Sequence, residues 1–177
     1  MLRPLHDRVV RAYLQAKDEC RPHLFPLAFA EDAVFVSRFD FETDFGNDTP
    51  REGIEAITET FRALGQQCEN IYTLCIPETV ESTATTMSCK WIVGMTERGS
   101  REVRVAWGDY QWRFDPARDR ATSLQVTMHR MAMMKPEAAG AVLGWLSAIE
   151  GPWCSAATLL EHVPARPQLE GVARYFA

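Results

Sequence analysis

The chain has 177 residues, of which 46% are hydrophobic and 24% are charged, with a formal net charge of −5. This length is enough for one domain with a substantial hydrophobic core. The negative balance gives no general attraction to nucleic acid or to an anionic membrane surface, and it argues against both as partners.

Three elements are predicted at the N-terminal end. Apolar residues at helical spacing predict a helix from about Leu5 to Glu19. After a break at Arg21-Pro22, a short second helix is expected from His23 to Phe29. The Val- and Phe-rich segment from Ala33 to Phe39 is typical of a strand, and an acidic segment then leads to a turn at Gly46-Asn47-Asp48.

The next helix has the clearest start signal in the chain. Thr49 is predicted as the N-cap, Pro50 suits the first helical position, and Glu52 stands where a capping box places its carboxylate. An apolar stripe follows from Ile54 to Leu64, and Gly65 is expected to end the helix.

The apolar period then shortens toward two, which predicts four strands. They are expected at Ile71 to Ile76, Thr83 to Thr96, Glu102 to Asp115 and Arg120 to Met134. Because short turns join them, consecutive strands must be antiparallel.

Two features flank this set of strands. The cluster Arg98, Arg101 and Arg104 is interpreted as part of a solvated hairpin. A last helix is predicted to begin at Pro136 and to end before Gly151-Pro152, with a tail that runs on to Ala177.

Helices followed by a long meander of strands are typical of an α+β fold. Long antiparallel strands twist and curl, so the sheet is expected to wrap around the N-terminal helices as a cone. The gap inside such a cone is apolar, and gaps of that kind hold small hydrophobic ligands.

Several short segments, in this order and at this spacing, carry a resemblance to a known family. They are Val9-Val10-Arg11-Ala12-Tyr13, Glu31-Asp32-Ala33-Val34-Phe35, Gly53-Ile54-Glu55-Ala56-Ile57 with Phe61, Trp112-Arg113-Phe114-Asp115, and Ser123-Leu124. Together they resemble the nuclear transport factor 2-like superfamily, which includes ketosteroid isomerase and the SnoaL-like polyketide cyclases. The resemblance implies a domain of that kind over residues 1–135, with a C-terminal helix and tail over 136–177 packed on it.

The resemblance also implies site positions. The oxyanion-binding Tyr of ketosteroid isomerase corresponds to Tyr13, and its carboxylate base corresponds to Ser37, which cannot act as such a base. A register slip of a few residues brings Asp40 to the base position instead. The position of the protonated acid corresponds to Tyr110, with Asp109 beside it on the opposite face. Of the three residues that this isomerase chemistry requires, the sequence therefore retains only the oxyanion-binding Tyr, at Tyr13.

Other candidates carry alternative interpretations. Met128 corresponds to a pocket-lining position of the isomerase, whereas its neighbour His129 is expected on the outer face, at a dimer contact. Trp91 shares one face of a central strand with Cys89, and buried residues of both types are common in cores. Tyr13 and Tyr110 can likewise be core aromatics rather than ligand contacts.

Catalytic and metal motifs are sparse. SnoaL-like cyclases use an acid late in the sheet, where this chain has only Met and Ala from Met131 to Met134. The alternating acids Asp40, Glu42 and Asp44 suit a solvated strand edge better than a cation site, so no metal is expected. No nucleotide or common hydrolase motif is present, and no cofactor is predicted.

Cysteine usage indicates a cytoplasmic protein. Five cysteines form an odd set without a CxxC pair, which argues for a reducing compartment. The N-terminal segment lacks the apolar stretch of a signal peptide, and no run reaches the length of a membrane-spanning helix.

Two functional hypotheses follow. The first is a pocket protein that binds a small hydrophobic ring-containing or carbonyl ligand, with isomerase-, cyclase- or dehydratase-type activity left open. The alternative is a non-enzymatic interaction or scaffold module that forms a homodimer through the outer sheet face. Trp107 and Trp112 point to opposite faces of one strand, so one of them is expected outside the cone.

Overall fold

The computed structural model describes residues 1–42 and 49–177. Three α-helices precede or interrupt the sheet and three follow it: α1 (Pro4–Asp18), α2 (Phe25–Ala28), α3 (Ile54–Gln67), α4 (Ala139–Ser147), α5 (Ala156–Glu161) and α6 (Glu170–Phe176). The strands are β1 (Phe29–Phe39), β2 (Arg51–Glu52), β3 (Cys68–Cys75), β4 (Glu81–Ser82), β5 (Thr86–Glu97), β6 (Val103–Asp115) and β7 (Arg120–Met134). Short 3-10 helices lie at Pro22–Leu24, Pro77–Thr79, Pro136–Ala138 and Pro167–Leu169.

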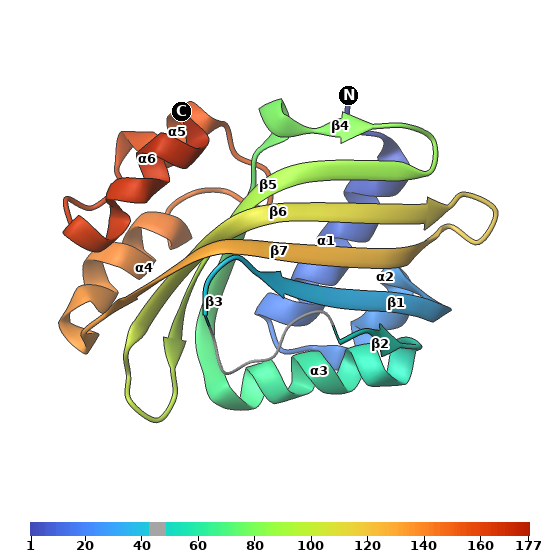
Figure 1. Ribbon diagram of the computed structural model, residues 1–177, viewed down its shortest axis with the longest axis horizontal. Helices are drawn as coiled ribbons and strands as arrows, with labels where there is room; N and C mark the ends of the chain where they lie inside the picture. The colour runs from blue at the N-terminus through green and yellow to red at the C-terminus, as the bar shows by residue number, and fades with distance from the viewer. Residues whose placement is uncertain (43–48) are drawn as a thin grey trace.

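The strands form one curved sheet in the order β2-β1-β7-β6-β5-β3, with β4 paired to β5 (Figure 1). The four long strands β3, β5, β6 and β7 are antiparallel, as predicted. β1, however, runs parallel to β7, so the sheet is mixed. The antiparallel argument holds only for strands joined by short turns. The chain leaves β1 through β2 and α3 and re-enters the sheet at the opposite edge, so no turn fixes the direction of β1.

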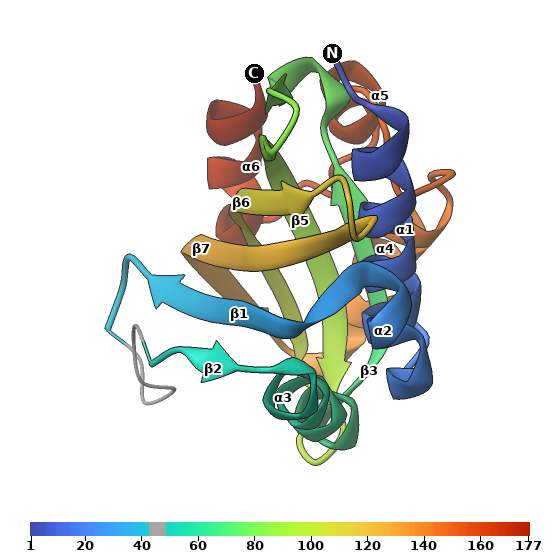
Figure 2. The ribbon, with the colours of Figure 1, turned by 90° about the vertical axis from the view of Figure 1, so that its right-hand side faces the viewer.

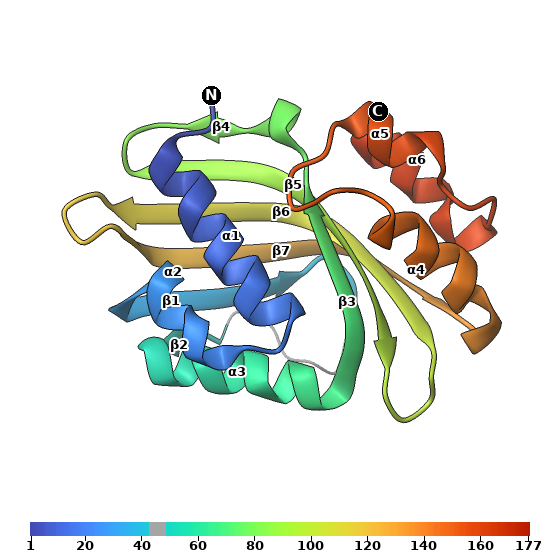
Figure 3. The same cartoon turned by 180° about the vertical axis from the view of Figure 1, so that it is seen from behind.

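The concave face of the sheet is covered by the N-terminal helices. In Figure 3, α1 lies diagonally across the strands and α3 runs along the edge near β1 and β2. The stripe Val9, Val10 and Tyr13 of α1 is almost fully buried against the inward side chains of the sheet. Ile57 anchors α3 in the same core. The α+β cone expected from the sequence is therefore confirmed.

A second core lies on the opposite face of the sheet. Helices α4 to α6 cover Trp107, Val105 and Ile92 there, and Trp107 keeps only 3% of its surface exposed. Figure 2 shows α1 and α6 on opposite sides of the central strands. Trp112 belongs to the inner core, so Trp107 is the tryptophan that lies outside the cone. No helix in the described part of the chain is long and apolar enough to span a membrane.

The predicted start of the third helix is wrong. Arg51–Glu52 forms β2 and pairs with β1, so neither Pro50 nor Glu52 belongs to the helix. α3 begins at Ile54 after Gly53, whose positive φ of 86° turns the chain from strand to helix. Cross-strand pairing has overridden the local capping signal. The helix also continues past Gly65 to Gln67.

A bulge interrupts the central ladder between β6 and β7. Trp107 pairs with Arg130 and Gly108 pairs with Met128, so His129 is the extra residue on β7. The two backbones approach so closely that a Cβ on Gly108 would lie 1.8 Å from the carbonyl oxygen of Thr127. Only glycine fits at this position without movement of β7.

Gly108→Ala should therefore destabilise the protein by about 3 kcal/mol or more, because the added methyl group collides with backbone that cannot rotate away. Gly144→Ala is the matched control: it lies in α4 with no atom within 4 Å of the added Cβ, and it should be neutral or stabilising by up to about 1 kcal/mol. Urea unfolding of the three proteins measures both effects. Equal stability of wild type and Gly108→Ala would contradict the close approach.

Candidate functional site

A cavity of about 330 Å³ lies between α1, α3 and the concave face of the sheet. Its walls are mostly aromatic and aliphatic, with Phe35, Phe61 and Met95 among the apolar side chains that line it. Exposed residues of the lining, such as Thr49 and Gln67, belong to the segments around α3. The volume lies within the range of small-ligand sites.

Three aromatic side chains with polar atoms line the cavity. Trp91 stacks on Tyr110 with ring centroids 5.2 Å apart, and Tyr13 meets Tyr110 edge-on at 5.9 Å. All three are at least 98% buried. Burial raises the pKa of both phenols far above the usual range. For Tyr13, the interaction with the Tyr110 hydroxyl lowers the pKa and offsets part of this rise. Both hydroxyls therefore stay neutral at physiological pH and can donate hydrogen bonds.

One donor of this group lacks an acceptor. The indole Nε1 of Trp91 is buried and has no hydrogen-bond partner among the described residues. An unpaired buried N–H costs about 1–3 kcal/mol relative to a bonded one. A ligand oxygen beside Trp91 would remove that cost.

Five of the residues singled out from the sequence line this cavity: Tyr13, Ser37, Trp91, Tyr110 and Met128. They come from α1, β1, β5, β6 and β7, so the fold brings together segments more than 100 positions apart in the sequence. Ser37 is partly buried on β1, and Met128 pairs with Gly108 across the ladder.

Asp40, Asp109 and His129 are not among the residues that line the cavity. Instead each ring nitrogen of His129 forms a hydrogen bond with a carboxylate. Nδ1 bonds with Asp40, and Nε2 bonds with Asp109 at 2.7 Å. The Tyr175 hydroxyl of α6 donates to Asp109 at 2.8 Å. The Lys90 ammonium donates to the Tyr175 carbonyl oxygen at 2.5 Å. These five residues form an outer-face cluster that connects β1, the bulge and the C-terminal helix.

The protonation of His129 depends on its two carboxylates. Burial opposes the charged imidazolium, but the hydrogen bonds to Asp109 and Asp40 outweigh burial and raise the pKa of His129 above 6.5. Protonated His129 then forms charge-assisted bonds to both carboxylates.

Sequence reasoning missed three cationic residues of the cavity wall: Lys17, Arg51 and Arg104. Arg104 was expected on a solvated hairpin, and that interpretation is wrong. It is partly buried on β6, its Nε is buried, and that nitrogen has no partner. The alternation of side chains along β6 could have predicted this placement, because Arg104 points to the same face of the strand as Tyr110. Lys17 lies one helical turn after Tyr13 on α1, so its place on the same helix face could also have been predicted.

No aspartate or glutamate is found among the described residues that line the cavity. Asp44, the third member of the acidic segment, lies outside the described residues. The described part of the chain also contains no group of His, Cys, Asp and Glu suited to a metal ion.

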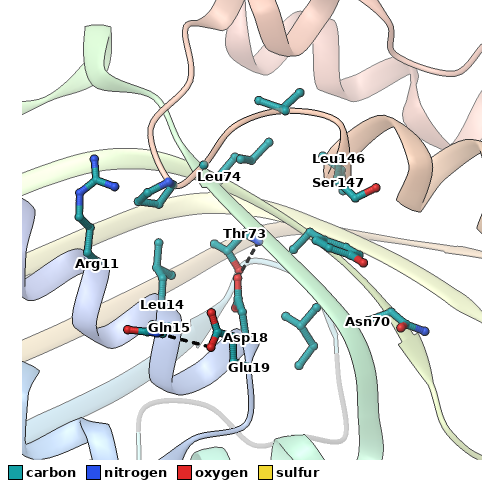
Figure 4. Close-up of a pocket in the computed structure, with 15 residues that line it drawn as sticks. Arg11, Leu14, Gln15, Asp18, Glu19, Asn70, Thr73, Leu74, Leu146 and Ser147 are labelled. Atoms are coloured by element: carbon teal, nitrogen blue, oxygen red, sulfur yellow. Dashed lines mark hydrogen bonds between the residues drawn. The ribbon is translucent and has the colours of Figure 1, made fainter.

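A second hollow of about 620 Å³ lies outside the cone, between α1, β3 and α4 (Figure 4). Its polar groups are already paired: Asp18 accepts hydrogen bonds from the Thr73 backbone N–H at 2.8 Å and from the Thr73 hydroxyl at 2.9 Å. None of the unpaired buried polar atoms of the described residues belongs to this hollow. The cavity inside the cone is therefore the better candidate site.

Comparison with solved structures identifies this architecture. A putative isomerase from Rhodopseudomonas palustris superposes with a TM-score of 0.60 at 17% identity, covering 72% of this chain and 91% of that one. A putative SnoaL-like polyketide cyclase from Shewanella denitrificans gives 0.57 at 17% identity, with 71% and 91% covered. A computationally designed 17-OHP binder gives 0.57 at 13% identity, with 74% and 99% covered.

The chain has the nuclear transport factor 2-like fold. The resemblance inferred from the sequence is confirmed at the level of the fold. No protein-family model matches the chain, and no curated protein sequence matches it. At these identities the similar structures establish the architecture, and the function must be argued from the side chains of the cavity.

The outer-face cluster makes stability depend on pH in a defined direction. Because folding raises the pKa of His129, its contribution is complete below the unfolded value of 6.5 and is lost as pH rises through the folded pKa. His129→Gln should therefore reduce stability more at about pH 5.5 than at about pH 8.5.

The control for this variant is His162→Gln, at a highly exposed site where the nearest carboxylate lies 3.8 Å away. Urea titrations at both pH values measure the difference between each variant and wild type. A His129→Gln deficit that does not change with pH would show that the ring contributes only packing.

Proposed function

We propose that the nuclear transport factor 2-like cavity of this chain binds a small hydrophobic, ring-containing or carbonyl ligand. The observation that carries the proposal is the unpaired Nε1 of Trp91 on a mostly aromatic and aliphatic wall, beside two neutral phenols. Trp112 also has an unpaired indole nitrogen, but it does not line the cavity. The argument therefore depends on Trp91, Tyr13 and Tyr110.

The same donors favour binding over catalysis. Neutral hydroxyl and indole donors can hold and polarise a carbonyl oxygen, as in an oxyanion hole. Isomerase-, cyclase- or dehydratase-type activity also needs a group that takes or gives a proton. Since no carboxylate or histidine is found on the described wall, we propose a binding protein first and an enzyme second.

One similar solved structure supports a small-molecule ligand. It is the computationally designed 17-OHP binder, which shares this architecture with a TM-score of 0.57. The volume of about 330 Å³ and the aromatic lining of the present cavity suit a compact ring system.

Removal of one phenolic hydroxyl tests the proposal. Native mass spectrometry and thermal shift against steroid, polyketide and aromatic ketone panels first identify a ligand. Tyr13→Phe and Tyr110→Phe should then weaken its binding by about 3- to 10-fold each, the value of one neutral hydrogen bond. Tyr72→Phe is the control, because Tyr72 is exposed and lies outside the cavity. Unchanged affinity in both cavity variants would remove the phenols from the site.

We also propose a homodimer through the open part of the outer sheet face. Helices α4 to α6 cover Trp107, so the remaining face is polar, with Ser88, Gln111 and Gln125 in register across three strands. A homodimer with two-fold symmetry would use this same polar patch on both copies. A cytoplasmic location is proposed as well, since all five cysteines are free.

Light scattering on the full chain should give twice the 20.1 kDa chain mass. A Gln111→Glu, Gln125→Glu double variant places carboxylates of both copies against one another and should shift the mass to that of one chain. Gln66→Glu, on the exposed side of α3, should leave the dimer intact. A single-chain mass for wild type at every concentration would contradict the dimer and the scaffold alternative that depends on it.

A further inference from the structure

We infer that the ligand of the cavity carries a carboxylate, which Arg104 binds. This inference rests on the proposed function and narrows it to an elongated hydrophobic acid. Nothing in the family resemblance assigns a role to this arginine. It is distinguished by its charge, its partial burial and the missing acceptor of its Nε among the described residues.

Three arginines lie along the β5–β6 hairpin, but their environments differ. Arg98 and Arg101 are exposed, and both form ion pairs with Glu69, at 2.7 Å and 2.6 Å. Arg104 is partly buried and lines the cavity. In the described part of the chain it has no carboxylate within ion-pair distance and no acceptor for its Nε.

The position of Arg104 in the sheet explains this difference. Arg104 pairs with Met95 on β5 and with Met133 on β7, and Met95 shares the cavity wall with it. Arg104 acts electrostatically on Glu97, whose oxygens accept hydrogen bonds from Ser100 and Gly99. That carboxylate is thus occupied in the hairpin turn.

The other two cations that line the cavity, Lys17 and Arg51, have different surroundings from Arg104. The Lys17 ammonium forms an ion pair with Asp18 and donates to the Thr73 hydroxyl at 2.7 Å, so its charge is compensated. Arg51 is exposed and its charge is hydrated. Arg104 thus combines a partly buried permanent charge with the absence of an ion-paired carboxylate among the described residues.

Such a guanidinium is most stable beside an anion. Its N–H fork matches the two oxygens of a carboxylate, and the resulting charge-assisted bonds are about twice as strong as neutral ones. A neutral ligand would leave the charge without a counterion inside the cone. The electrostatics of the wall therefore favour acids over their esters and amides.

Strand geometry gives the shape of the acid. Trp91 pairs with Gly108, and Arg104 lies four residues from Gly108 on β6, which at the usual strand rise is roughly 13 Å. The Arg104 side chain shortens that span because it can extend along the wall. A ligand that satisfies both ends has an oxygen acceptor on a ring, near Trp91 and the phenols, and a carboxylate at the other end.

Matched acids and esters test the inference. The probes are a keto-steroid carboxylic acid and a methoxynaphthyl acetic acid, each compared with its methyl ester by isothermal titration and by quenching of tryptophan fluorescence. Wild type should bind an acid about 10- to 100-fold more tightly than its ester, the range for a hydrogen bond to a charged group. Arg104→Met should abolish this preference while ester binding stays within about threefold.

Two further variants complete the design. Arg104→Lys keeps the charge but loses the fork, so it should restore only part of the preference. Arg101→Met removes an exposed arginine of the same hairpin and should leave the preference unchanged. If Arg104→Met does not fold, Arg104→Lys still tests the inference, because an unchanged acid-to-ester ratio in that variant would contradict recognition by the guanidinium fork.

The outcomes separate the two proposals. Equal binding of acid and ester by wild type, or a preference that survives in Arg104→Met, would overturn the carboxylate inference while the pocket remains a ligand site. Binding of neutral ketones alone would do the same. Failure of every acid, ester and ketone to bind would overturn the proposed function itself.

Discussion

Alternation of side chains along β5 and β6 is the constraint on which the rest of the structure depends. In these strands one set of side chains points into the cone, and part of the other set, including Ile92, Val105 and Trp107, is buried under the C-terminal helices. A slip of one residue would place Trp107 in the cavity and Tyr110 outside it. Gly108 and the bulge at His129 maintain the register, because the backbones are too close there for any larger residue.

This two-sided burial separates two kinds of polar chemistry. On the outer face, the polar atoms of Asp40, Asp109 and His129 bond one another, and the cluster fastens the C-terminal helix to the sheet through Tyr175. On the inner face, Trp91 and Arg104 keep donors without acceptors. Satisfied networks stabilise a fold, whereas unpaired buried donors weaken it unless something else binds them. That difference is why the cavity, and not the outer cluster, is the candidate site.

The sequence predicted the fold well because its signals are repeated along each element. β7 was predicted with its observed bounds, and α1 and β6 were each predicted to within one residue at either end. Errors arose where pairing between distant segments decided the outcome: Arg51–Glu52 joins β1 instead of opening a helix, and β1 runs parallel to β7. Local capping rules contain no information about such partners.

The site was predicted less completely, for a related reason. Aromatic residues such as Tyr13 were found by their helical face and by the family resemblance, whereas Arg104 was grouped with its exposed neighbours in a charged turn. The alternation of side chains along β6 places Arg104 on the inner face. Charged side chains are so rarely buried, however, that it was predicted to be exposed. A partly buried arginine whose Nε has no acceptor among the described residues departs from local rules, and such departures are expected at functional sites. The wall thus combines neutral donors beside Trp91 with a permanent cation at Arg104, and this combination is the basis of the proposed recognition of an acid.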